Sequence, residues 1–170
     1  FLKNNNIPLQ TLQGETEFLR TLTPAAEHSW LLLMAVARQL PSAVDHVIGG
    51  EWDRNQFPGV MLKEKTLGIV GCGRIGQWMS KYATAFDMEC LGFDPHLDSW
   101  PSRIESVGLE NLLSRSDFVS VHVPLNENTS NLLNRERITK MKKGSVLINT
   151  SRGKVIDEDS LLDSLKKGHL

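Results

Sequence analysis

An apolar run followed by three regularly spaced glycines constrains this chain more than any other feature. Residues 66–70 are rich in β-branched and aliphatic side chains, which is typical of a strand buried on both faces of a parallel sheet. Gly71, Gly73 and Gly76 follow at once in the spacing G-x-G-x-x-G, and helix-forming residues begin at about Arg74. Glycine permits a tight turn, close approach of a pyrophosphate and close packing of the helix on the strand. The N–H groups that begin the helix attract an anion, so this stretch predicts a phosphate-binding unit.

An acidic residue follows the glycine motif at the spacing of a dinucleotide site. A second short apolar run, residues 88–93, ends in Asp94, roughly 20 positions after the motif. An aspartate there accepts hydrogen bonds from an adenosine ribose, and its charge repels the additional phosphate of NADP. We therefore predict NAD rather than NADP as the cofactor. A glycine-rich turn that binds nothing stays open as an alternative, because 13 glycines can produce this spacing by chance.

Charge, hydropathy and cysteine content narrow the class of protein. The chain of 170 residues has a formal net charge of −1 and no run of like charges, so we expect no nucleic-acid partner. The longest apolar stretch, residues 30–37, is too short to span a bilayer, and no signal sequence is recognisable, so we expect no membrane association. Cys72 and Cys90 lie in or beside apolar strands, which predicts small buried thiols rather than a disulfide or a metal site. This cysteine usage fits a cytoplasmic protein.

Strands and helices alternate along the chain. After the glycine motif the predicted order is a strand ending at Asp94, a helix at 109–114, a strand at 117–123, a helix at 134–141, a strand at 145–150 and a helix from 157. Such alternation indicates an α/β fold, a doubly wound parallel sheet with helices on both faces. Ligands of these sheets bind at the carboxyl ends of the strands. Pro124, Arg152 and Gly153 lie at such ends.

Upstream of the glycine motif, an apolar helix and a loop predict a subunit contact. The helix is expected from Pro24 to about Leu40, before Pro41, with Thr23 as its N-cap. Because residues 30–37 are apolar on all sides, we expect burial on every side, either at a central position or, as we favour, at a subunit interface. Residues 49–59 have chain breakers at both ends, which predicts an extended arm whose aromatic residues pack onto something else. We predict a homodimer formed through the 24–40 helix and the 49–59 arm.

Several motifs together resemble the D-isomer-specific 2-hydroxyacid dehydrogenase family, which includes phosphoglycerate, D-lactate, formate and glyoxylate/hydroxypyruvate dehydrogenases. They are Ala26-Glu27-His28, the glycine motif, Asp94-Pro95, His122-Val123-Pro124-Leu125, and Ile148-Asn149-Thr150-Ser151-Arg152-Gly153 with Ile156-Asp157-Glu158. The resemblance covers roughly residues 23–170, and Asn-Thr-Ser-Arg-Gly is far more specific than the glycine motif. It implies a Rossmann-type NAD-binding domain of the phosphoglycerate dehydrogenase-like kind at 23–170. Residues 1–22 are then a remnant of the substrate domain and hinge, and we expect a chain truncated at both ends that lacks most of the second domain.

The resemblance implies roles only at matched positions. Arg152 matches the arginine that holds the substrate carboxylate and polarises the carbonyl, a task suited to a planar cation with two prongs. The residues implied for cofactor binding are Gly71, Gly73, Arg74, Ile75, Gly76, Asp94, Val123, Pro124, Thr129, Thr150 and Ser151. His122 matches a strand position and not the family's proton donor. The general acid–base histidine and its glutamate lie further downstream in the family, beyond Leu170.

The implied activity is hydride transfer between the nicotinamide of NAD and C2 of a small 2-hydroxy or 2-oxo acid. The cofactor carries the hydride, and the protein supplies placement and charge. We expect this chain alone to bind NAD without efficient turnover. An alternative stays open, because an NAD-sensing binding module of the corepressor type has the same motifs in this window. Downstream sequence with a catalytic histidine and glutamate distinguishes the enzyme from the sensor.

Overall fold

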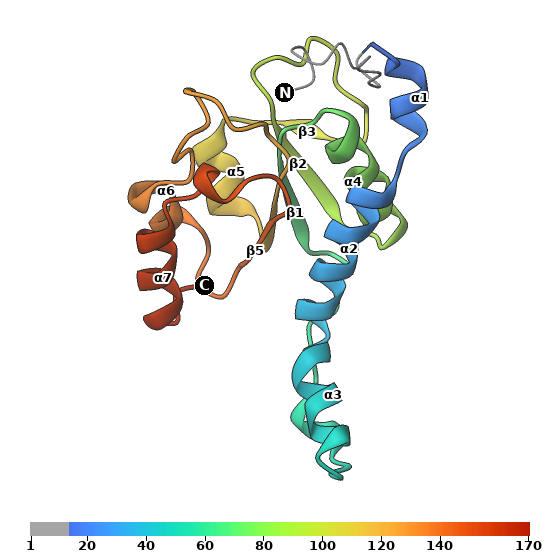
Figure 1. Cartoon of the computed structure of the whole chain (residues 1–170), viewed down its shortest axis with the longest axis vertical. Helices are drawn as coiled ribbons and strands as arrows, with labels where there is room; N and C mark the ends of the chain where they lie inside the picture. The colour runs from blue at the N-terminus through green and yellow to red at the C-terminus, as the bar shows by residue number, and fades with distance from the viewer. Residues whose placement is uncertain (1–13) are drawn as a thin grey trace, which may run out of the picture.

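A parallel sheet with helices on both faces forms the body of the molecule (Figure 1). The computed structural model describes residues 14–170, and the predicted truncated start therefore lies largely outside the described residues. The strands are β1 Thr66–Val70, β2 Glu89–Phe93, β3 Glu105–Ser106, β4 Phe118–Val121 and β5 Val146–Asn149. Their order across the sheet is β3-β2-β1-β4-β5, and all neighbours pair in parallel. This confirms the predicted doubly wound α/β fold.

Helices connect the strands and cover the two faces of the sheet. They are α1 Thr16–Thr21, α2 Pro24–Ala37, α3 Leu40–Ile48, α4 Arg74–Ala85, α5 Leu109–Arg115, α6 Arg135–Lys140 and α7 Glu158–Lys166, with short 3-10 turns η2 Arg54–Gln56 and η3 Gly153–Val155. Apolar residues of α2 and α4 pack on one face, and those of α5 and α6 pack on the other. The sequence did not predict β3, because its two residues are exposed and polar.

The central strand β1 contributes to both cores. All five of its residues are buried. Leu67 and Ile69 belong to the core under α2 and α4, whereas Val70 belongs to the core under α5 and α6. Successive side chains of a strand point to opposite faces, so a strand in the middle of a three-layer fold must be apolar throughout. The prediction of a strand buried on both faces is confirmed.

The strands end in register at one edge of the sheet. The last residues pair as Val70 with Phe93, Val70 with Val121, and Val121 with Asn149. The residues that come next are Gly71, Asp94, His122 and Thr150. Because the strands are parallel and aligned, the four segments that carry the predicted site residues leave the sheet together. We call this row the carboxyl edge.

The predicted helix from Pro24 to Leu40 is two helices. α2 ends at Ala37, and α3 begins at Leu40 with Pro41 in its first turn. Between them Gln39 has a φ of 52°, a left-handed conformation that interrupts the helical hydrogen bonds. A proline is well tolerated in a first turn because its ring fixes a helical φ and its missing N–H is not needed there. Pro41 therefore starts a second helix, and the prediction of a single helix is wrong.

Within this chain α2 is buried on one side. Ala26, Ser29, Leu33 and Ala37 are buried, whereas Leu31, Leu32 and Val36 are exposed. Trp30 packs inside the chain, with ring centroids 5.8 Å from Tyr82 and 5.1 Å from Phe86. The central position that the prediction allowed is therefore wrong for the described residues, while burial of the exposed side by a second subunit stays a prediction. The exposed side keeps the predicted interface open.

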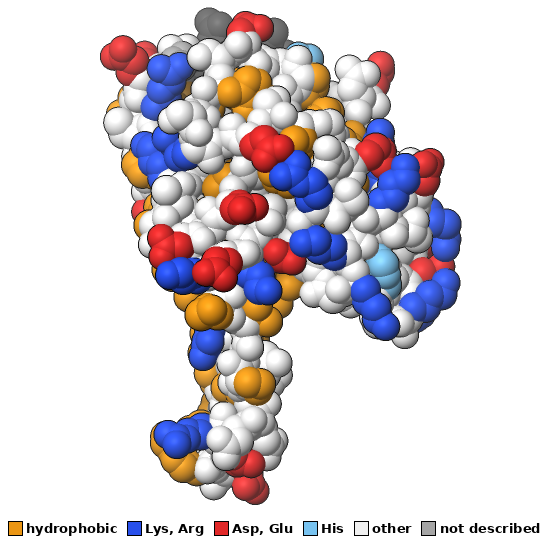
Figure 2. Space-filling model, turned by 180° about the vertical axis from the view of Figure 1, so that it is seen from behind, with side chains coloured by type: hydrophobic (Ala, Val, Ile, Leu, Met, Phe, Trp, Pro, Cys, Tyr) orange, Lys and Arg blue, Asp and Glu red, His pale blue; other side chains and the backbone are white. Residues whose placement is uncertain are grey.

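α3 and residues 49–61 form a projection that we call the arm (Figures 1 and 2). No residue of α3 is buried within the part of the chain described here. The returning segment folds back on α3, because the His46 Nε2 accepts the Asp53 N–H at 3.0 Å and the His46 and Phe57 rings lie 5.3 Å apart. Phe57 thus packs within the arm, contrary to the predicted extended segment, while Trp52 is 86% exposed.

The arm is rich in exposed apolar side chains. These are Leu40, Val44, Val47, Ile48, Trp52, Val60 and Met61. Such a concentration on one projecting element is unusual for a surface in contact with water alone. Across residues 14–170 no single helix is both long and apolar enough to span a bilayer; only α1–α2 taken with α3 reaches that length and composition, and this pair bends by 65°.

Candidate functional site

The turn after β1 requires glycine at two positions. Gly71 has a φ of +91°, and its N–H donates to the Phe93 carbonyl at 2.9 Å. A Cβ at this position would lie 2.8 Å from the carbonyl oxygen of His122. A Cβ at Gly76 would overlap the carbonyl oxygen of Gly71. The glycine pattern thus allows α4 and the end of β4 to approach the turn closely, as the spacing predicted.

Gly73 has a different environment, because it faces open space. A Cβ there would meet no atom within 4 Å, and Gly73 is the N-cap of α4. No side chain caps this helix start, and its first turn contains no acidic residue. Arg74 and Ile75 open the helix. Uncapped N–H groups at the positive end of a 12-residue helix beside an open glycine fit the diphosphate of a dinucleotide.

Asp94 is fixed by two backbone groups next to the glycine turn. Its Oδ2 accepts the Cys72 N–H at 2.9 Å, and its Oδ1 accepts the His96 N–H at 3.0 Å. A carboxylate has about four lone-pair sites, so acceptor capacity remains for the hydroxyls of a ribose. The sequence predicted the position of this carboxylate but not the bond that ties it to Cys72.

Both cysteines are buried, as predicted, and neither forms a disulfide. Burial, with a further contribution from the charge of Asp94, raises the pKa of the Cys72 thiol to about 12. Burial likewise raises the pKa of Cys90 to about 11. A protonated thiol is a poor nucleophile and a poor metal ligand. Cys72 therefore contributes packing and its backbone N–H to this edge, and no thiol chemistry.

The loop after β4 bends back over the glycine turn. A Cβ at Gly71 would lie 2.9 Å from Cγ1 of Val123, so this side chain lies directly against the turn. The Thr129 hydroxyl donates to the Pro124 carbonyl at 2.5 Å and accepts the Asn126 N–H at 2.8 Å. The Thr129 hydroxyl thus closes the loop that carries Pro124.

His122 directly follows β4 at the carboxyl edge and is partly buried. Its Nε2 lies 2.8 Å from the Ser120 hydroxyl. Burial lowers the pKa of the imidazole from its usual 6.5 to about 4. A general acid at neutral pH needs a pKa near the working pH. This agrees with the interpretation that His122 is not the proton donor.

The turn after β5 is organised by the side chain of Asn149. Its Oδ1 accepts the Ser151 N–H at 3.0 Å and the Ser151 hydroxyl at 2.7 Å, and its Nδ2 donates to the Arg152 carbonyl at 3.0 Å. Asn149 belongs to the Asn-Thr-Ser-Arg-Gly motif, but the sequence pattern predicted no role for it. The available signal was chemical, because asparagine commonly bonds the N–H two residues further on and so forms a local turn.

A second connection ties this turn to α2. The Ser29 and Thr150 hydroxyl oxygens lie 2.7 Å apart, and the Ser29 hydroxyl donates to the Ala25 carbonyl at 2.7 Å. Since a hydroxyl has one proton to give, Thr150 must be the donor to Ser29. Ser29 is fully buried. No local sequence signal could have paired these residues, which are 121 positions apart.

Arg152 lies at the surface of the carboxyl edge. Its side chain donates from Nη1 to the Ser151 carbonyl at 2.8 Å. No carboxylate of residues 14–170 forms an ion pair with it. A guanidinium has five N–H donors, so donors remain for an incoming group. The guanidinium can hold a carboxylate in two-pronged fashion at the same edge of the sheet as the glycine turn.

A hollow of about 590 Å³ lies beside the start of α4 and is covered by α1. Arg74 donates to the Leu19 carbonyl at 3.0 Å, and the Trp78 indole donates to the Arg20 carbonyl at 3.1 Å. Gly73 and Arg74 are the predicted site residues in its lining. These contacts hold α1 against α4.

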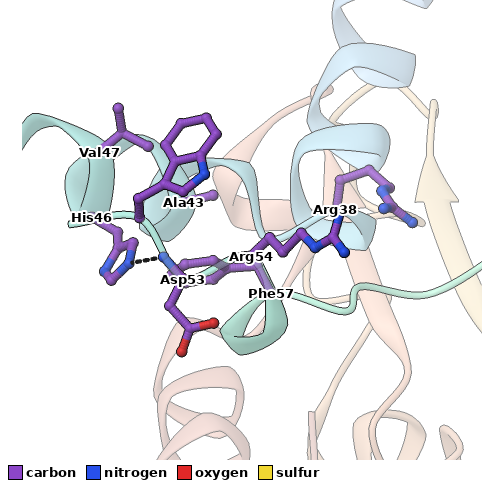
Figure 3. Close-up of a pocket in the computed structure, with 8 residues that line it drawn as sticks. Arg38, Ala43, His46, Val47, Asp53, Arg54 and Phe57 are labelled. Atoms are coloured by element: carbon purple, nitrogen blue, oxygen red, sulfur yellow. Dashed lines mark hydrogen bonds between the residues drawn. The ribbon is translucent and has the colours of Figure 1, made fainter.

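A smaller hollow of about 240 Å³ lies on the arm, away from the carboxyl edge (Figure 3). Its lining residues are Arg38, Ala43, His46, Val47, Trp52, Asp53, Arg54 and Phe57. None of the predicted site residues is among them. Its walls combine apolar and aromatic side chains with the charged side chains of Arg38, Asp53 and Arg54.

The chain is similar in sequence to a known protein family. Residues 30–170 match the family model described as D-isomer specific 2-hydroxyacid dehydrogenase, NAD binding domain. A D-3-phosphoglycerate dehydrogenase of Methanocaldococcus jannaschii is 42% identical over 152 residues, covering 85% of this chain and 28% of that protein. A hydroxypyruvate reductase of Thermotoga maritima is 41% identical over 143 residues, covering 84% of this chain and 47% of the relative.

Among solved structures, a D-lactate dehydrogenase from Aquifex aeolicus complexed with NAD and lactic acid superposes with a TM-score of 0.81 at 33% identity. The match covers 86% of this chain and 45% of that one. The chain therefore spans between 28% and 47% of the length of these three proteins. The residues that match the family model, 30–170, include the wound sheet and its carboxyl edge.

Proposed function

The chain belongs to the D-isomer specific 2-hydroxyacid dehydrogenase family through its NAD-binding domain, and on this premise we propose that the whole protein is an NAD-dependent oxidoreductase acting on a D-2-hydroxy acid. One observation carries the proposal. The glycine turn, Asp94 and the turn that bears Arg152 leave the aligned strands at the same edge of the sheet. A cofactor site and a carboxylate-binding cation are thereby brought together.

The residues of this edge divide between the parts of the dinucleotide. We assign the diphosphate to Gly71, Gly73, Arg74, Ile75 and Gly76, and the adenosine ribose to Asp94, whose charge favours NAD over NADP. Val123, Pro124 and Thr129 flank the cofactor, and Thr150 and Ser151 lie toward the nicotinamide. Bound NAD supplies the hydride carrier. The open space at Gly73 and the fixed carboxylate of Asp94 support this assignment.

Arg152 is assigned to the substrate. The names of the relatives and of the structural neighbour refer to 3-phosphoglycerate, hydroxypyruvate and lactate, which share a carboxylate next to a hydroxyl or oxo carbon. A guanidinium can hold that carboxylate and stabilise the negative charge that develops on the C2 oxygen. We assign the proton to a histidine oriented by a glutamate outside these 170 residues, since partial burial lowers the pKa of His122 to about 4.

The domain boundaries, the oligomeric state and the location of the protein are also proposals. We propose residues 23–170 as the NAD-binding domain and residues 1–22 as part of the substrate domain and hinge. The exposed apolar side chains of α2 and the arm support a homodimer formed through these segments. Two buried cysteines that form no disulfide support a cytoplasmic location.

A substrate screen on the whole protein tests the proposed reaction. NADH absorbance is followed with hydroxypyruvate, pyruvate and glyoxylate, and NAD reduction with D-3-phosphoglycerate and D-lactate. We expect turnover with at least one acid, and we expect Arg152→Gln to lower kcat/KM by roughly 10²–10³-fold through loss of the two-pronged contact. NADH binding without turnover of any acid would instead favour the corepressor-like sensor.

Asp94→Ala tests the cofactor assignment in the same assay. The variant should weaken NADH binding and lose the discrimination against NADPH, because the carboxylate that repels the additional phosphate is gone. Glu89→Ala, which removes an exposed acid at the opposite end of β2, is the control. An unchanged NADH to NADPH preference in Asp94→Ala would remove Asp94 from this role.

A further inference from the structure

We propose that Asn149 is a positioning residue for Arg152, through hydrogen bonds that fix the backbone on which the guanidinium is carried. This inference rests on the proposed function, since it concerns how the substrate-binding cation is held. The Asn149 side chain forms three hydrogen bonds, two with Ser151 and one with Arg152. Its carboxamide accepts at one end of this two-residue segment and donates at the other.

The anchor of these bonds is rigid. Asn149 is the last residue of β5 and pairs in register with Val121 of β4. Its side chain therefore starts from the sheet and reaches forward to the Ser151 N–H and the Arg152 carbonyl. Both groups are fixed relative to the same strand ends that carry the glycine turn. The distance between the turn and the Arg152 backbone is set by this link.

Arg152 has little else to hold it. Its side chain is exposed and donates a hydrogen bond to the neighbouring carbonyl of Ser151. A long side chain on a mobile backbone explores many positions, and an error of about 1 Å in a substrate-binding group can cost roughly 10²-fold in rate. The placement of the guanidinium consequently depends on the backbone, and the backbone depends on Asn149.

The carboxamide is the side chain that meets this requirement. It offers an acceptor oxygen and a donor nitrogen on a short stem. Aspartate at this position could accept from Ser151, but it could not donate to the Arg152 carbonyl, and its charge would compete with the substrate for the guanidinium. Alanine would remove all three bonds. The neighbouring Thr150 would still be tied to Ser29, so the turn would loosen without detaching from the fold.

The test is a double-mutant cycle on the whole protein with the fastest acid from the screen. Asn149→Ala, Arg152→Gln and the double variant are compared by kcat, KM for the acid, Kd for NADH from fluorescence quenching, and Tm. At saturating NADH, Asn149→Ala should lower kcat/KM for the acid at least 30-fold. The Kd for NADH should rise by a smaller factor, because Asn149 also holds Ser151, which we assign to the nicotinamide side. In the Arg152→Gln background the same substitution should lower kcat/KM less than about threefold further, because Asn149 acts through Arg152.

Asn134→Ala is the matched control. Asn134 is the N-cap of α6, where its Oδ1 accepts the Arg137 N–H at 3.0 Å. This control should lower Tm by a similar amount and leave kcat/KM unchanged. An Asn149→Ala effect that is undiminished in the Arg152→Gln background, or that is confined to Tm, overturns the proposal for Asn149 alone. Absence of turnover by the unsubstituted protein overturns the proposed function and this inference with it.

Discussion

The carboxyl edge and the arm differ in how much of their structure is held by contacts within the chain. At the edge each segment is tied by hydrogen bonds, such as Asp94 to Cys72, Asn149 to Ser151 and Thr150 to Ser29. In the arm no residue of α3 is buried, and an apolar surface that includes Ile48 and Trp52 is exposed. Hydrogen bonds within the chain fix the segments of the edge. The arm also folds back on itself, through the bond between the Asp53 N–H and His46, but its apolar surface is not covered by residues 14–170. The residues proposed for cofactor binding therefore come from one chain. The arm, in contrast, has an apolar surface that we propose is covered by a second copy of the chain.

The largest expected effect is on the arm. Ile48 is 80% exposed, and Ile48→Asp should weaken association of the whole protein at least 100-fold, because an unpaired charge would be buried at the proposed contact. Sedimentation over a range of concentrations measures this. Leu162→Asp, at a 49% exposed position on α7, should leave the mass unchanged. Retention of the parent's mass by Ile48→Asp at every concentration would remove the arm from the interface.

The glycine turn should be the least tolerant part of the edge. Gly71→Ala forces a side chain into a φ of +91° and against the His122 carbonyl, which should lower the free energy of unfolding by about 3 kcal/mol. Gly144→Ala shares a positive φ of +77° but meets nothing within 4 Å, so about 1 kcal/mol is expected. Urea unfolding compares the two. Equal losses would mean that the close approach of β4 to the turn is unimportant.

Because His122 lies at the carboxyl edge, we expect the stability of the edge to depend on pH. Its pKa is about 4 in the fold and about 6.5 when unfolded, so the unfolded chain takes up the proton first as the pH falls. Stability from this group should fall by about 2 kcal/mol between pH 7 and pH 5 and be regained as the pH rises. Urea midpoints of the parent and of His122→Asn, at both pH values, isolate the effect. An identical pH slope in both proteins would contradict the assignment.

The smallest effect concerns the link between α2 and the edge. Ser29→Ala removes the acceptor of the Thr150 hydroxyl, and a loss of about 1 kcal/mol in the free energy of unfolding is expected, with weaker NADH binding. Ser114→Ala removes an exposed hydroxyl that donates to the Asn111 carbonyl, and it should change neither quantity. If the two variants behave alike, the buried hydroxyl pair has no part in holding the edge.

Local signals predicted the elements that position the site. The apolar run of β1, the glycine spacing and the acid at Asp94 each depend on neighbouring residues, and the structure has them where the pattern indicated. Local signals failed where a residue has two uses. Pro41 was interpreted as the end of a helix although proline also begins one, and the left-handed Gln39 that separates α2 from α3 has no strong signature.

Residues that act across the fold could not be found in this way. Ser29 and Asn149 both stabilise the turn before Arg152, one from a helix far away in sequence and the other from the end of β5. Asn149 had a local chemical signal that was not used. Ser29 had none, because its partner is chosen by the packing of α2 against the sheet.

The sequence by itself determined the wound α/β fold and the positions of the glycine turn, Asp94 and Arg152, to which we assign the phosphates, the ribose and the substrate carboxylate. Hydrophobic periodicity and turn chemistry depend on residues that are close together in the sequence. The fold class and the glycine turn can therefore be predicted from the sequence alone. Only the tertiary structure decided that four strands end in register, that α2 turns one side outward, and that the arm folds back on itself while leaving apolar side chains exposed. These three features depend on which segments that are distant in sequence pair and pack against one another, and local sequence patterns do not specify those pairings.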